Sequence, residues 1–167
     1  MSRLTRLFLI VCFSLVLAGC SKPEPAPPRT ANFTCSFTAH YQDLTVGGTL
    51  TRYTQGTLTL DFTEPETLRD VRALWDGEQM KVQYHGITFD IDDADIPETA
   101  LGKQLVTALD NALNATGERN HDTVTVNGSV DGTAYTYTYA ADSGLPLSLS
   151  VPSLPLEVTF SHITLQE

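Results

Sequence analysis

The residues that most often do chemistry in proteins are few and scattered in this 167-residue sequence. It contains none of the motifs typical of serine hydrolases, zinc hydrolases, nucleotide-binding loops or CxxC redox centres. Its four histidines fall in loops or on the polar phase of an alternating pattern, at His40, His85, His121 and His162. Because spacing brings no nucleophile, base and charge-stabilising donor together, we expect no enzyme, no catalytic residues and no cofactor.

The densest group of carboxylates lies in FDIDDADIPE, which contains Asp90, Asp92, Asp93 and Asp95. Calcium sites need several oxygen ligands on one tight loop. An EF-hand would require an oxygen ligand in place of Ala94 and a glycine in place of Asp95, and neither is present. The alternation instead places Asp90 and Asp92 on the outer face of a strand, so we expect no metal site.

The N-terminal apolar run ends at a cysteine that is a candidate for covalent lipidation. Arg3 and Arg6 precede an apolar run that is shorter than a membrane span. The run ends in LAGC, residues 17–20, which resembles a bacterial lipobox at every position. The resemblance implies that residues 1–19 are a lipoprotein signal peptide and that Cys20 carries diacylglycerol and a further acyl chain such as palmitate. The alternative is an ordinary secretory signal with an incidental cysteine.

Two or three acyl chains on Cys20 would give stable membrane anchoring, since each buried methylene contributes about 0.8 kcal/mol. We therefore expect a protein that is lipid-anchored at the extracytoplasmic face of the cell membrane, or at the outer membrane in an organism with two membranes. Residues 20–32 are rich in proline and favour an extended conformation. They are predicted to be a spacer before a single domain over residues 33–167.

The charge of the chain excludes some classes of partner. The formal net charge is −10. Residues 1–19 contain two arginines and no acidic residue, so the remainder has 8 Lys+Arg against 20 Asp+Glu, a net charge of −12. Such a chain repels phosphate backbones and anionic headgroups. We expect no nucleic-acid partner, and a membrane contact through the lipid anchor alone.

Period-two alternation dominates the domain and predicts many antiparallel strands. In FTCSFTAHY the alternation puts Cys35 on an apolar face, so we predict that this thiol is buried and not a nucleophile. Gly47 and Gly48 suggest a bulge within the next strand. Asp76 and Gly77 lie between two apolar alternations, which is a strong signal of a hairpin.

One segment changes to a helical period. In the stretch from Asp95 to Gly117, leucines recur at 101, 105, 109 and 113, which predicts an amphipathic helix of about four turns. Gln104 and Asp110 are among the residues expected on its polar side. A single amphipathic helix among antiparallel strands buries its apolar stripe, centred on Leu105, against one face of the sheet.

A stripe of tyrosines is the third feature that could do chemistry. Tyr135, Tyr137 and Tyr139 share one face of a predicted strand, and Tyr84 lies on the apolar phase of another. Aromatic side chains on one face can line an apolar cavity, with hydroxyl groups to orient a ligand. They can equally pack across strands in a solid core. The sequence alone leaves both readings open.

The order of hairpins resembles the lipoprotein-carrier superfamily of LolA/LolB-like proteins. The matching positions are Phe62 with Pro65, Asp76 and Gly77 with Tyr84, and Asp142 and Gly144 with Pro146 and Leu149. The carrier's Arg-Trp pair after the proline is replaced here by Glu66 and Thr67. What the resemblance implies is therefore a half-barrel with an apolar concavity, rather than transfer of acylated proteins.

These observations lead to one expected fold and two functional hypotheses. The fold is mainly β, of the α+β kind: a single curved antiparallel sheet that forms an incomplete barrel around one amphipathic helix. The first hypothesis is binding of a lipid or other apolar ligand in the concavity. The candidate ligand-binding residues are Tyr84, Leu105, Tyr135, Tyr137 and Tyr139. The second is a solid-core module that presents an acidic face to a protein partner.

Overall fold

The computed structural model describes residues 24–97, 100–130 and 132–166. Cys20, the predicted signal peptide and the first residues of the predicted spacer lie outside the described residues. The predictions made for them are taken up again below as proposals.

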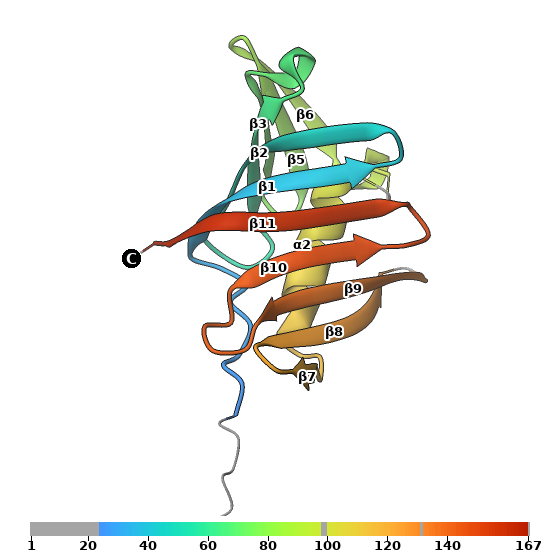
Figure 1. Ribbon diagram of the computed structural model, residues 1–167. Coiled ribbons are helices and arrows are strands. Elements are labelled where there is room, and N and C mark those ends of the chain that lie inside the picture. The colour runs from blue at the N-terminus through green and yellow to red at the C-terminus, as the bar shows by residue number, and fades with distance from the viewer. Residues whose placement is uncertain (1–23, 98–99, 131, 167) are drawn as a thin grey trace, which may run out of the picture.

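The described residues form one antiparallel sheet and one α-helix (Figure 1). The strands are β1 (Phe33–Tyr41), β2 (Leu44–Arg52), β3 (Leu58–Glu64), β4 (Val71–Trp75), β5 (Gln79–Tyr84), β6 (Ile87–Asp92), β7 (Glu118–Asn120), β8 (Thr123–Val130), β9 (Thr133–Ala140), β10 (Pro146–Val151) and β11 (Leu156–Leu165). The α-helix is α2 (Leu101–Ala112), and two short 3-10 helices are η1 (Glu66–Leu68) and η2 (Asp93–Asp95).

The strand order makes the sheet an open, curved half-barrel. It runs β6-β5-β4-β3-β2-β1-β11-β10-β9-β8-β7, so β1 pairs with both β2 and β11 at the centre. The two outermost strands, β6 and β7, are joined through α2, which crosses one face of the sheet (Figure 1). The expected fold class, an incomplete antiparallel barrel around one helix, is confirmed.

The local predictions for the first strands are also confirmed. Phe33, Cys35 and Phe37 alternate along β1 as buried residues. The register of β2 against β3 shifts between Gly47 and Gly48, where the sequence suggests a bulge. A side chain at Gly48 would overlap the backbone of the neighbouring strand at Asp61, so glycine is required there.

The helix is shorter than expected, and its buried face differs from the leucine stripe. Leu105 and Leu109 are buried, as predicted, and α2 packs against β3, β8 and β9. The helix ends at Ala112, so Leu113 lies outside it and is exposed. Gln104, expected on the polar side, is buried with Leu105 and Val106, so the buried face of α2 is wider than the leucine stripe.

The described part of the predicted spacer is attached to the domain. Residues 24–30 have no regular secondary structure. The amide of Ala26 donates to the carbonyl of Ala141 at 2.8 Å, and the amide of Arg29 donates to the carbonyl of Gly144 at 2.8 Å. Thr30 is buried. The second half of the predicted spacer is therefore held against the turn between β9 and β10, which the composition did not indicate.

Gly144 is the residue that permits this attachment, and replacing it should release the segment. Gly144 has a φ of +72°, and a Cβ there would overlap the carbonyl oxygen of Pro27. We expect Gly144→Ala to expose the Arg29–Thr30 bond and to accelerate its cleavage by trypsin.

The matched control is Gly86→Ala, since Gly86 has a φ of +82° and open space around its Cα. Both variants should lose about 1 kcal/mol of stability from the positive φ. Only Gly144→Ala should be cut faster at Arg29, and equal cleavage of the two variants would contradict the attachment.

Candidate functional site

An apolar groove opens at the end of the sheet where α2 begins. Its volume is about 340 Å³. It lies between the adjoining ends of β1 and β2, the segment from β3 to η1, the start of α2 and the start of β11. The lining residues are Ala39, Tyr41, Leu44, Val46, Phe62, Leu68, Ala100, Leu101 and Leu156. Of the side chains that line it, only Tyr41 carries a polar group.

The local sequence explains why the groove is apolar. Ala39 and Val46 are directly paired across β1 and β2, and both face the inner side of the sheet. Gly48 lies between Phe37 and Phe62 in the register and has no side chain, so these two rings meet edge to face at 5.9 Å. The contact fixes Phe62 as one wall of the groove.

The three tyrosines of β9 lie in the core and do not line this groove. Tyr135, Tyr137 and Tyr139 are all buried, and the rings of Tyr137 and Tyr139 lie 6.0 Å apart. A side chain at Gly128, which pairs with Tyr135, would overlap the Tyr135 ring, so the glycine makes room for it. Burial raises the pKa of all three hydroxyl groups. These tyrosines are therefore residues of the hydrophobic core.

The other two candidate residues are also outside the groove. Leu105 is completely buried on the inward face of α2, in the same core as the β9 tyrosines. Tyr84 lies apart from them at the turn between β5 and β6, where it is exposed and its ring contacts that of His85 at 4.2 Å. The structure therefore brings Leu105 together with the tyrosines but separates Tyr84. Ligand contact by these five residues stays a prediction.

Cys35 is buried in the core, and burial raises the pKa of its thiol to about 12. The nucleophile in cysteine chemistry is the thiolate. At neutral pH this side chain is a protonated, apolar filler of the β1 face, in agreement with the sequence prediction.

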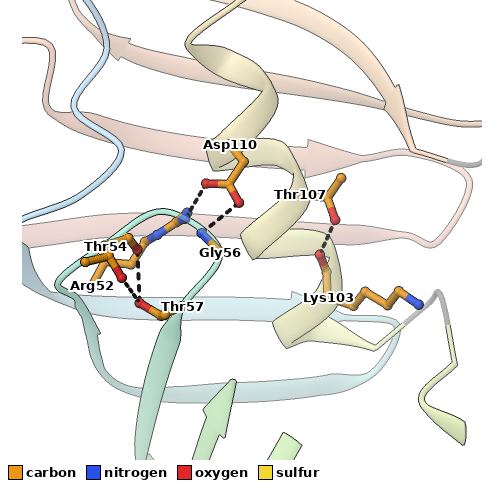
Figure 2. Close-up of polar contacts among 7 residues, drawn as sticks. All are labelled: Arg52, Thr54, Gly56, Thr57, Lys103, Thr107 and Asp110. Carbon is orange, nitrogen blue, oxygen red and sulfur yellow. Dashed lines mark hydrogen bonds and ion pairs between the residues drawn. The ribbon is translucent and has the colours of Figure 1, made fainter. Parts of the chain in front are cut away.

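An ion pair between a fully buried arginine and a partly exposed aspartate joins α2 to the sheet beside the core (Figure 2). The Arg52 side chain, at the end of β2, has an exposed fraction of 0 % and donates from Nη2 to Oδ1 of Asp110 on α2. The other carboxylate oxygen of Asp110 accepts the amide of Gly56 at 3.1 Å. Asp110 thereby holds both a side chain of β2 and the turn that leads to β3.

The environment of this pair makes it sensitive to loss of either partner. Desolvation lowers the pKa of Arg52, while the charge of Asp110 and its hydrogen bond raise it. Nε and Nη1 of Arg52 and the hydroxyl of Tyr137 are buried without a hydrogen-bond partner among the described residues. Asp110 is thus the main compensation for a charge that is taken out of water.

Local sequence patterns do not predict this pair. Asp110 was assigned to the solvated side of the helix, and Arg52 stands at the end of a strand, where a solvent-exposed arginine is ordinary. The sequence offers one indication that Arg52 is buried. It lies an even number of positions after Val46 and Leu50 in β2, so it shares the inner face of the strand with them.

In the parts of the chain that the structure describes, no group of three or more histidine, cysteine, aspartate or glutamate side chains is placed to hold a metal ion. Among the same residues, no helix combines the length and hydropathy needed to cross a bilayer.

Comparisons with known proteins find similarity at the level of structure and not of sequence. No family model matches the sequence, and no curated protein matches it. The chain is similar to the crystal structure of a LolA superfamily protein from Nitrosomonas europaea. The identity is 11 % and the TM-score 0.39, over 83 % of this chain and 87 % of the other. At this similarity, membership of the LolA/LolB-like superfamily stays a prediction.

Removing the partner of the buried arginine should be costly. We expect Asp110→Asn to lower the free energy of unfolding by about 3 kcal/mol, because it leaves the Arg52 charge buried without compensation. Urea denaturation of the variant and the parent protein measures this difference.

The control is Asp61→Asn, which breaks the ion pair between Asp61 and Arg72. Nε of Arg72 lies 2.5 Å from Oδ1 of Asp61, and the side chains of Asp61 and Arg72 are 36 % and 53 % exposed. An exposed pair contributes about 0 to 1 kcal/mol. Similar losses for the two variants would show that burial adds nothing to the Arg52–Asp110 pair.

Proposed function

We propose that the protein binds a lipid acyl chain, or a similar apolar ligand, in the groove at the start of α2, without catalysing a reaction. The observation that carries the proposal is the lining of the groove, where eight of nine side chains are apolar and only Tyr41 has a hydroxyl group. Ligand sites in proteins are mostly apolar clefts with few polar groups that fix orientation.

The size of the groove favours a slender ligand. Its volume of about 340 Å³ is close to the lower end of ligand pockets, which span roughly 300 to 1,000 Å³. Leu44 stands exposed at its mouth, so part of a bound chain would remain in contact with solvent or with a partner. Each methylene buried in the groove would contribute about 0.8 kcal/mol.

We further propose that Cys20 anchors this domain to the extracytoplasmic face of a membrane. Support comes from the LAGC tetrad and the apolar run before it. Because Ala26 is bonded to the domain, five residues, 21–25, separate Cys20 from the first attachment point. The six Cα-to-Cα steps from Cys20 to Ala26 reach about 20 Å when extended, so the domain would be held close to the membrane surface.

A second candidate function is a solid-core interaction module that presents an acidic face to a protein partner. Two observations favour it: the burial of the β9 tyrosines in the core, and the net charge of −12 beyond residue 19. It differs from the first proposal in predicting that the groove binds no apolar ligand.

Filling the groove tests the ligand proposal. The delipidated protein should bind an environment-sensitive fatty-acid probe saturably. Leu101→Trp should weaken this binding at least about tenfold, since the indole would occupy the space between α2 and Phe62.

Leu147→Trp is the matched control, because Leu147 lies on the exposed face of β10. Fluorescence titration with the probe, with thermal melts of each variant, separates loss of binding from loss of folding. Absence of saturable binding to the well-folded parent protein would favour the interaction module.

The anchoring proposal has its own test. Cys20→Ser removes the thiol that would carry the lipid, and we expect the variant to move from the membrane fraction to the soluble fraction. Cys35→Ser should leave the distribution unchanged, since that thiol is buried in the domain. Equal membrane retention of the Cys20→Ser variant and the parent protein would refute lipid anchoring.

A further inference from the structure

The strand β6 forms one edge of the sheet, and its inner face is apolar and exposed. Tyr84, Ile87 and Phe89 have exposed fractions of 42 %, 58 % and 54 %. Tyr84 on β5 pairs with Ile87 on β6, so the three side chains share one face. Exposed apolar edge strands are prone to pair with other chains, and soluble proteins usually shorten or cover them. Such an uncovered edge indicates an interaction surface.

The outer face of the same strand is acidic. Asp90 and Asp92 alternate with Phe89 and Ile91 along β6, and both aspartates are exposed. The edge therefore presents apolar side chains on one side and carboxylates on the other, at the period of a β-strand.

The turn before β6 determines which backbone groups face the open edge. His85 and Gly86 have φ values of +47° and +82°, as in a type I′ two-residue turn. Tyr84 and Ile87 then form the hydrogen-bonded pair that closes the hairpin, and such pairs alternate along an antiparallel ladder. The amides of Thr88 and Asp90 consequently point away from β5, toward an incoming strand.

We infer that β6 is a docking edge, to which a partner protein adds an extended strand whose apolar side chains alternate with lysine or arginine. The added main chain would bond to the amides of Thr88 and Asp90, its apolar side chains would cover Ile87 and Phe89, and its cations would face the two aspartates. The edge amides, the apolar side chains and the carboxylates of β6 would thus each meet a complementary group on the partner strand.

Charge complementarity selects this occupant over others. A second copy of β6 would bring its own Asp90 and Asp92 to the same face, where like charges oppose pairing. An acyl chain would use neither the edge amides nor the carboxylates. A basic partner is in addition attracted by the acidic chain as a whole, which speeds its encounter.

The probe for this inference is a synthetic hexapeptide of alternating valine and lysine, with blocked ends. Its comparison peptide alternates valine and glutamate. We expect the lysine peptide to slow hydrogen exchange in β6 of the purified full-length protein, and the glutamate peptide to have no effect. The protection should weaken as salt is added, because the contacting charges are exposed.

Two variants test the two kinds of contact. Thr88→Pro removes one edge amide without removing a bond to β5, and should weaken binding of the lysine peptide roughly tenfold. The double variant Asp90→Lys/Asp92→Lys should reverse the preference, so that the glutamate peptide binds more tightly than the lysine peptide. This reversal also keeps the test valid if the proline variant does not fold.

The matched control is Asp142→Lys/Glu157→Lys, which makes the same change in net charge at exposed positions on other strands and turns. The control should retain the preference for the lysine peptide. Loss of preference in this control would reveal unspecific charge attraction and overturn the inference.

Two further results would overturn it. One is absence of β6 protection by either peptide, and the other is protection that rises with protein concentration alone, which would assign the edge to a second copy. The inference is independent of the ligand groove, since Thr88 and the two aspartates do not line it. Binding of the fatty-acid probe should accordingly be the same in Thr88→Pro and the parent protein.

Discussion

In the part of the chain that the structure describes, one short helix has to cover the inner face of a very wide sheet. The helix α2 has 12 residues, which corresponds to a length of about 18 Å. Eleven strands at about 4.8 Å spacing span about 48 Å before curvature is considered. The helix therefore covers only part of the apolar face. The groove beside its first turn and the exposed apolar edge at β6 both follow from this mismatch.

The ion pair between Arg52 and Asp110 determines which part is covered. It joins the end of β2 to the last turns of α2, and the amide of Gly56 binds the same carboxylate. With the end of the helix held against β2 and β3, its opposite end lies where β1, β2 and η1 leave an apolar opening. A charged contact that is unfavourable to bury thus positions the surface on which the proposed ligand would lie.

The attachment of residues 24–30 gives the domain a direction relative to its proposed anchor. This segment leaves the molecule on the side of β7 to β10, whereas β6 and η1 lie at the opposite end (Figure 1). A domain anchored through Cys20 would accordingly present its β6 edge away from the membrane to which it is attached. That arrangement suits an edge that receives a protein partner from the surrounding compartment.

Local sequence patterns predicted the strands, the hairpin turn at Asp76 and Gly77, the amphipathic helix and the burial of Cys35, because alternation, helical period and turn residues act over a few positions. The burial of Tyr135 could also be predicted from strand alternation, and that of Leu105 from the helical period. Tertiary structure alone decided the buried pair of Arg52 with Asp110, the attachment of the proline-rich segment and the groove around Leu101. Each joins residues distant in the chain, and each depends on how far a 12-residue helix reaches across a curved sheet. A pattern along one strand records which face is apolar, but not whether another element covers that face.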